Sequence, residues 1–211
     1  MFIEKSLTNY ISDVSSGAPT PGGGSVSALV GSLGAALTSM VGNLTVGKKA
    51  YDALDEDIKK EIDNNMKEIQ KLIERLEEIV DEDTKAFDEV MDAFKLPKGT
   101  EEEKKARTEA IQAGTKTALE VPLECAEKCF QVLKLQKVFA EYGNANAITD
   151  VGVGALLAYA GVEGALFNVK INLASIKDEE YKEKIEKEVG SILTESKNLK
   201  EEILKVVYSK L

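Results

Sequence analysis

Apolar residues recur every three, four or seven positions through most of the chain, which is the period of an amphipathic α-helix. Alternating patterns typical of strands are almost missing, and four prolines and several glycine-rich stretches separate the periodic segments. The sequence therefore predicts an all-α fold, a single-domain bundle of long helices over residues 1–211. The amphipathic and apolar patterns predict helices over about 2–14, 58–94, 100–142 and 147–172. They also predict an apolar helix that follows the glycine turn and ends near residue 47, and a last helix after Asp178.

Two stretches lack the polar face of an ordinary surface helix. Residues 21–47 carry no charge, and residues 143–169 carry only Asp150 and Glu163. Uncharged stretches of this length are long enough to cross a bilayer. Glycine, serine and threonine dilute the first stretch, however, and no aromatic belt flanks it. We therefore expect two helices buried inside a bundle and no membrane association.

Small residues form rows at intervals of four along both stretches. Such rows lie on one helix face and let a neighbouring helix approach until the backbones nearly touch. We expect these two helices to pack closely, within a subunit or across a two-fold axis, and we expect a homodimer. The rows are Gly23, Ser27, Gly31, Ala35 and Ser39; Gly24, Ala28, Ser32 and Ala36; and, less strictly, Gly152, Leu156, Ala160 and Gly164.

Composition narrows the chemistry. A formal net charge of −10 argues against nucleic acid as a partner, because binding phosphates needs a cationic surface. Histidine is absent, so no imidazole is available as a metal ligand or as a partner for a nucleophile, and no metal site is expected. Acid–base chemistry must then come from Asp, Glu, Lys, Tyr or Cys.

The two cysteines, Cys125 and Cys129, lie four residues apart, on one face of a helix. They are interpreted as core residues in a reducing compartment and not as a disulfide framework. The first residues lack the basic and apolar regions of a secretory signal, so we expect a cytoplasmic location.

Asp83 is the first candidate for catalysis. It falls on the apolar stripe of the predicted helix 58–94, where a hydrophobic side chain is expected. Burying a carboxylate costs several kcal/mol unless it is paired or protonated, so such a position indicates either a proton donor or acceptor, or a structural ion pair or helix cap.

Asp150 is the second candidate. It stands near the start of an apolar helix beside Asn146 and Thr149, which form a polar cluster with it, although the helix dipole alone would also favour an anion there. Glu163 is ranked below it. Glu124 is interpreted as a surface residue.

Two further features suit an anionic ligand. The turn of Gly22, Gly23, Gly24 and Ser25 precedes an apolar helix, where free backbone amides can bind an anion, although a tight helix start explains the glycines equally well. Lys48 and Lys49 are expected to end that helix and either stabilise its dipole or bind carboxylates.

Several of these segments together resemble the formiminotransferase-cyclodeaminase family. The matching segments come in the family's order and cover nearly the whole chain. They are residues 18–29, 40–49, 86–87 with Asp83, 96–98, 121–123, 143–152 and 168–173.

The resemblance implies an all-helical dimer acting on tetrahydrofolate derivatives, including polyglutamylated ones, with no cofactor beyond that substrate. Formimidoyltetrahydrofolate cyclodeaminase is the activity we expect, with methenyltetrahydrofolate cyclohydrolase as the alternative; a helical scaffold that binds folate without turnover is the non-enzyme alternative. Carboxylates with separated pKa values suit either reaction.

On this hypothesis Asp83 and Asp150 perform acid–base catalysis. Asn146 and Thr149 orient the folate, and Lys48 or Lys49 holds its glutamate tail. The turn of Gly22, Gly23, Gly24 and Ser25 shapes the wall of the site.

Overall fold

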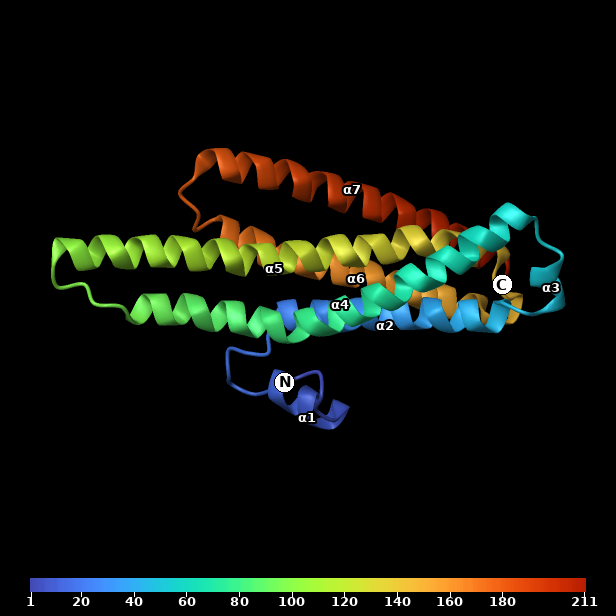
Figure 1. The fold of residues 1–211 in the computed structure, drawn as a ribbon, viewed down its shortest axis with the longest axis horizontal. Coiled ribbons are helices and arrows are strands. Elements are labelled where there is room, and N and C mark those ends of the chain that lie inside the picture. The colour runs from blue at the N-terminus through green and yellow to red at the C-terminus, as the bar shows by residue number, and fades with distance from the viewer.

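The computed structural model describes residues 1–211 as an elongated bundle of helices without strands (Figure 1). Four long helices form the body of the bundle, α7 lies along one side, and the short α1 lies outside the opposite side. The helices are α1 (Leu7–Val14), α2 (Gly23–Thr45), α3 (Lys49–Asp52), α4 (Glu56–Lys95), α5 (Glu101–Tyr142), the 3₁₀ turn η1 (Ala145–Ala147), α6 (Ile148–Leu173) and α7 (Glu179–Ser209).

The two apolar helices, α2 and α6, are the centre of the bundle and run antiparallel. At one end Gly23 faces Asn168, and at the other the backbone amide of Asn144 donates to Thr45 Oγ1 over 2.9 Å. Between these points a Cβ on Gly34 would lie 2.8 Å from the carbonyl oxygen of Gly154, which is closer than side chains normally approach. The predicted close packing of the two helices is confirmed, and it occurs within one subunit.

Both central helices are long and apolar enough to cross a membrane, with mean hydropathies of 1.5 and 1.3 in their most apolar windows. In those windows 56% and 50% of the residues are buried inside the bundle. Their faces pack against α4 and α5, which supports the interpretation of both as core helices.

Local signals in the sequence set most of the helix boundaries. Thr100 and Glu103 form a reciprocal capping box at the start of α5, and the Asp178 side chain accepts from the amide of Tyr181 at the start of α7. α5 continues through Pro122.

Two predicted boundaries were wrong. The helix expected from residue 2 begins only at Leu7, because Ser6 caps it and the preceding residues form a separate turn that binds α4. α2 ends at Thr45, since Val46 is extended and Gly47 adopts a left-handed φ of 73°. Lys48 and Lys49 consequently stand at the start of α3 and do not end α2.

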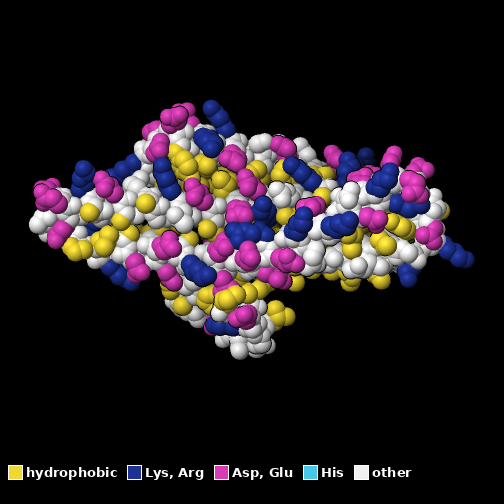
Figure 2. All heavy atoms as spheres, in the orientation of Figure 1, with side chains coloured by type: hydrophobic (Ala, Val, Ile, Leu, Met, Phe, Trp, Pro, Cys, Tyr) yellow, Lys and Arg dark blue, Asp and Glu magenta, His cyan; other side chains and the backbone are white.

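The face in Figure 2 shows acidic and basic side chains interspersed along the outer helices. The strongest ion-pair cluster lies on this outer layer, where Arg75 of α4 contacts Glu78 and Glu82 of its own helix and Glu124 of α5 at 2.7–2.8 Å. This cluster ties α4 to α5 by paired hydrogen bonds. The sequence predicted Glu124 to be a surface residue. In the structure it is instead part of an ion pair between α4 and α5.

Candidate active site

A cavity of about 490 Å³ opens at the N-terminus of α2, where four helices meet. The glycine turn forms one wall, α4 and the first half of α5 form two others, and the last turns of α6 close it. It is lined by Pro19, Thr20, Gly22, Gly23, Gly24, Asp83, Phe87, Val90, Met91, Phe94, Ile111, Gln112, Thr115, Ala118, Asn168, Ile171, Asn172 and Ser175.

Asp83 is the only ionisable side chain in this lining. Its Oδ2 accepts a hydrogen bond of 3.0 Å from the backbone amide of Ser25, in the first turn of α2. Burial raises the pKa of the Asp83 carboxyl, and the Ser25 hydrogen bond partly opposes that rise. A raised pKa brings the two protonation states of this carboxyl closer in energy, which suits a group that must both give and take protons.

The glycine turn lets this carboxyl approach. α2 has Gly22 as its N-cap residue, with no side chain to satisfy the first amides of the helix. Asp83 supplies that acceptor from α4 instead, so the helix-cap role considered for it is real and coexists with its place in the cavity. A Cβ on Gly24 would collide with the Asp83 carboxylate, which explains why glycine is needed at this position.

Three amide side chains contribute to the polar part of the lining. Asn168 Nδ2 donates to the Gly164 carbonyl over 3.0 Å, and Asn172 Nδ2 donates to the Ala118 carbonyl over 2.7 Å. These bonds fix both side chains and leave their oxygens able to accept from a ligand. Gln112 is held between the Ser175 carbonyl and the Lys177 amide.

These amides were not among the candidate site residues predicted from the sequence. Asn168 and Asn172 nevertheless lie four residues apart at the end of an almost uncharged helix. That spacing places them on one face and was a usable signal. The remaining lining includes the hydroxyl side chains of Thr20, Thr115 and Ser175. Its apolar part includes Phe87, Met91 and Phe94 from α4 and Ile171 from α6. A flat heteroaromatic ligand suits such a mixture of apolar walls and a few polar groups.

Comparison with known proteins identifies the family. Residues 6–191 match the model of the formiminotransferase-cyclodeaminase family. The chain belongs to this family. A methenyltetrahydrofolate cyclohydrolase of Methylorubrum extorquens is 42% identical to it over 207 residues, which cover 98% of each chain.

Two other family members complete the comparison. The formimidoyltransferase-cyclodeaminase of Rattus norvegicus is 39% identical over 195 residues, which are 92% of this chain but only 35% of that longer protein. The crystal structure of a formiminotetrahydrofolate cyclodeaminase from Thermotoga maritima superposes with a TM-score of 0.86 at 28% identity and covers 98% of this chain and 97% of its own. The chain is thus a member of an enzyme family with the helical fold predicted from its sequence.

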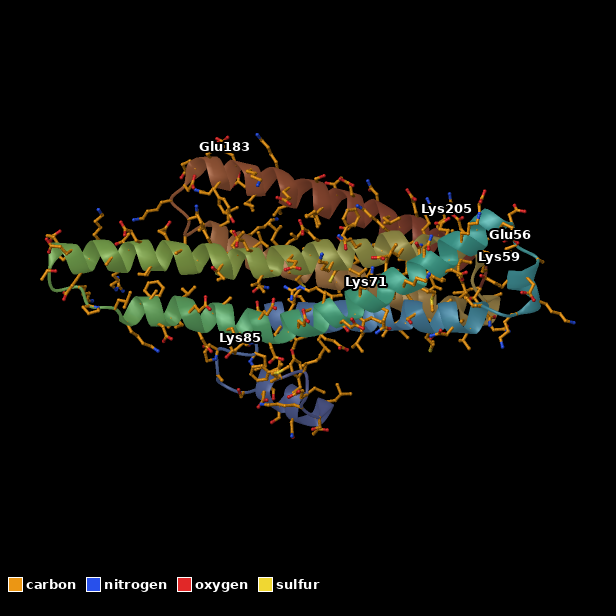
Figure 3. All side chains as sticks on the ribbon, in the orientation of Figure 1. Glu56, Lys59, Lys71, Lys85, Glu183 and Lys205 are labelled. Carbon is orange, nitrogen blue, oxygen red and sulfur yellow. The ribbon has the colours of Figure 1, made fainter.

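The other candidate residues of this family member lie at the opposite end of the bundle. Asn146, Thr149 and Asp150 belong to η1 and the first turn of α6, and none of them lines the cavity. At about 1.5 Å per residue, Asp150 lies about 27 Å along α6 from Asn168. Lys48 and Lys49 stand at the start of α3, at the same distant end of the bundle. In Figure 3 the labels of Glu56 and Lys59 mark this end, and the label of Lys85 marks the part of α4 that carries Asp83.

Four further residues take structural positions. Ser25 is fully buried, and its hydroxyl lies 2.9 Å from the hydroxyl of Tyr10, so only its backbone takes part in the contact with Asp83. Cys125 and Cys129 are buried in the core, and burial together with their mutual contact raises the pKa of the Cys125 thiol, which disfavours a reactive thiolate. Glu163 is half-buried on α6 away from the cavity.

A second cavity of about 500 Å³ lies between α6 and α7, lined by Lys170, Lys182 and Glu186 over an apolar floor. It has no amide side chain and no glycine turn with exposed helix amides. The cavity at Asp83 therefore remains the candidate active site.

Proposed function

We propose that the chain acts on tetrahydrofolate at the carbon that bridges N5 and N10, and that its reaction is the hydrolysis of 5,10-methenyltetrahydrofolate to 10-formyltetrahydrofolate. The full-length match to a cyclohydrolase at 42% identity favours this reaction over cyclodeamination. The observation that carries the proposal is the single carboxyl of Asp83 in a cavity otherwise without charge.

Charge complementarity supports this substrate. The methenyl bridge is an amidinium that carries a positive charge shared between N5 and N10. No lysine or arginine lines the cavity, and Asp83 provides the only negative group. In a partly desolvated site, that carboxylate would attract the cation more strongly than it would in water.

Asp83 can perform the two proton transfers that form and break the tetrahedral intermediate of the hydrolysis. As a carboxylate it takes a proton from water while the water oxygen forms a bond to the methenyl carbon, and the positive charge is neutralised. The resulting carboxylic acid then gives its proton to N5 as the bond between that carbon and N5 breaks. The remaining hydroxyl proton leaves to solvent as the formyl C=O forms on N10, so one proton is released for each turnover.

Cyclodeamination is the second candidate, favoured by the Thermotoga maritima structure, which aligns over nearly the whole chain. Here N10 attacks the protonated formimino carbon on N5 and loses its proton to Asp83. Asp83 then protonates the departing nitrogen, ammonia leaves, and the methenyl bridge remains. Both reactions pass through a tetrahedral carbon at the same place, and apart from the water consumed in the hydrolysis they need no group beyond the folate and Asp83.

The lining residues divide the recognition of such a substrate. The side-chain oxygens of Asn168 and Asn172 would accept from the amino and ring N–H groups of the pterin, and Phe87 and Phe94 would pack against its flat faces. Gly22, Gly23 and Gly24 would shape the wall next to Asp83.

A second copy of the chain would account for the distant cluster. Apolar side chains remain exposed along one face of α2 and α6, among them Leu33, Met40, Leu156, Phe167 and Ile171. Pairing these faces around a two-fold axis perpendicular to the helices would bring the Asp150 end of one copy over the Asp83 cavity of the other. Lys48 and Lys49 would then supply the missing cations for the glutamate tail of the substrate.

The decisive experiment is an assay of the purified protein with 5,10-methenyltetrahydrofolate and, separately, with 5-formimidoyltetrahydrofolate. Loss of the methenyl absorbance with the first substrate supports hydrolysis, and its appearance with the second supports cyclodeamination. A thermal shift with either compound but no turnover would instead indicate a folate-binding scaffold. Asp83→Asn provides the matched inactive control.

A further inference from the structure

The segment before α2 forms a closed chain of contacts that begins and ends on α4. We propose that this N-terminal arm, residues 1–14, is a positioning device for Asp83, with Tyr10 as its key positioning residue. The inference rests on the proposed function, because it assumes that Asp83 carries out the proton transfers.

The first contact anchors the arm to α4. Asp81 is 7% exposed, and its carboxylate accepts from the backbone amides of Phe2 at 2.5 Å and Ile3 at 3.4 Å. A hydrogen bond of 3.0 Å from Lys5 N to Phe2 O closes the turn that presents these amides. A carboxylate bound to two backbone amides is a strong and directional contact.

The second contact carries the arm to α2. The Tyr10 ring is 6% exposed and meets the Phe2 ring edge-on, with centroids 6.4 Å apart. Its hydroxyl lies 2.9 Å from Ser25 Oγ, and Ser25 is fully buried. The backbone amide of that serine holds Asp83 Oδ2 at 3.0 Å. Tyr10 thereby fixes the residue that orients the carboxyl.

The rest of the arm makes little contact with the bundle. Figure 1 shows α1 outside the four long helices, and Leu7 and Ile11 are 69% and 64% exposed. Tyr10 is the only buried residue of α1. An arm that served only to cover the core would bury the apolar face of α1 that carries Leu7 and Ile11. Instead, the buried contact of α1 is the one that Tyr10 makes with Ser25.

Few ionisable groups face Asp83, so a change in the pKa of its carboxyl can be assigned to a small number of contacts. Repulsion from the Asp83 carboxylate contributes to a raised pKa for Tyr10 of α1 and for Cys125 of α5, while burial is the main cause for Tyr10 and contact with Cys129 for Cys125. Asp81 is the other carboxylate that acts on Tyr10. No lysine or arginine contributes to the shift of Asp83 itself.

The test is Tyr10→Phe, which removes one oxygen and keeps the ring. Loosening Ser25 weakens the hydrogen bond that lowers the pKa of Asp83, so the midpoint of the kcat–pH profile should move to higher pH. We expect kcat to fall about fivefold to tenfold, the effect of losing one buried hydrogen bond, with KM changed less than twofold. Tyr208→Phe is the matched control, since Tyr208 is 73% exposed.

Two further comparisons separate positioning from a general loss of stability. Ser25→Ala should reproduce the effect, and adding Tyr10→Phe to it should cause no further loss, because both changes break the same contact. Asp81→Asn keeps an oxygen for the Phe2 amide and should retain more activity than Asp81→Ala, with circular dichroism confirming that each variant is folded.

The outcomes distinguish a failure of the proposed function from a failure of the proposed role of the N-terminal arm. Full activity in Asp83→Asn would overturn the proposed function. An inactive Asp83→Asn together with a folded Tyr10→Phe whose kcat and pH profile match the wild type would overturn the role of the arm alone.

Discussion

The two ends of the central helix pair carry their polar groups in different settings. At the α2 N-terminus, Asp83 is half-buried in a cavity, capped by a backbone amide and surrounded by apolar side chains and amides. At the other end, Thr149, Lys48 and Lys49 are exposed, and Asp150 is only partly covered. The first environment changes the pKa of its carboxyl and holds it in place, whereas the second offers charge without an enclosing cavity. The difference favours the Asp83 end as the proposed place of the chemistry and leaves the other end an assisting role.

The largest effect expected from this comparison is that of Asp83→Asn. An asparagine oxygen can still accept from Ser25 N, so the cap remains while the proton transfers are lost, and kcat should fall about 10²- to 10⁴-fold. Steady-state assays with the preferred folate substrate measure this directly.

The same variant has a defined effect on stability. The folded-state pKa of Asp83 is raised, so this carboxyl favours folding in its protonated form, and its contribution declines as pH rises from its unfolded value of about 3.9 through the folded pKa. Asp83→Asn should therefore unfold at neutral pH at a temperature equal to or above that of the wild type. A clear drop in melting temperature would mean that the carboxylate serves the fold more than the reaction.

Gly24→Ala should have the next largest effect. The new methyl group would displace the Asp83 carboxylate, so activity should fall about 100-fold, and overpacking should cost about 1–3 kcal/mol of stability. Gly17→Ala is the matched control, because no atom lies within 4 Å of a Cβ at that position. Equal activity of the two variants would show that the Asp83 carboxyl need not be held where it is.

The third prediction concerns the distant end. If a second copy brings Asp150 to the cavity, Asp150→Asn should lose about 10- to 100-fold in activity although its fold is intact. Mixing it with Asp83→Asn under conditions of subunit exchange should restore about a quarter of wild-type activity, because half of the dimers are mixed and each has one intact site. Sedimentation analysis measures the dimer, and unchanged activity of Asp150→Asn alone would confine the reaction to the Asp83 end.

The smallest effect on catalysis is expected for Arg75→Gln, which lies on α4 outside the cavity. The Arg75 guanidinium lowers the pKa of Glu124, so this pair stabilises the fold above the unfolded pKa of about 4.3 and loses its effect as pH falls through the lower folded value. With partly exposed partners the loss should be about 1 kcal/mol at neutral pH and should be smaller at an acidic pH that protonates Glu124. Urea unfolding at both pH values tests this, and kcat should stay within about twofold of the wild type.

Much of the fold could be predicted from local patterns. The capping residues Thr100 and Asp178 start their helices as expected, and the small residues of α2 and α6 pack as their spacing indicated. Asp83 stood out because it interrupts an apolar stripe. These features depend on helical periodicity, which a single sequence displays directly.

The grouping of the site could not be read from the same patterns. Asp83 and Asp150 were assigned to one site from their local sequence positions and the family resemblance, but the antiparallel helices place them at opposite ends of the bundle. Helix lengths held part of the answer: Asp83 lies about 40 Å along α4 from its start, a distance close to the whole length of α2. The proposed role of Tyr10 could not be predicted from the sequence, because it depends on one side-chain hydrogen bond between α1 and α2 that helical periodicity does not indicate.

The contact between the backbones of α2 and α6 also limits which sequences this fold accepts. A Cβ on Gly34 would lie 2.9 Å from the backbone nitrogen of Ala158. Because helices are stiff and the core is closely packed, even a single methyl group there would force α2 and α6 apart. Substitutions introduced for laboratory evolution are better placed on the outward faces of α4, α5 and α7. A change on α2 or α6 would also shift the walls of the proposed active-site cavity at Asp83.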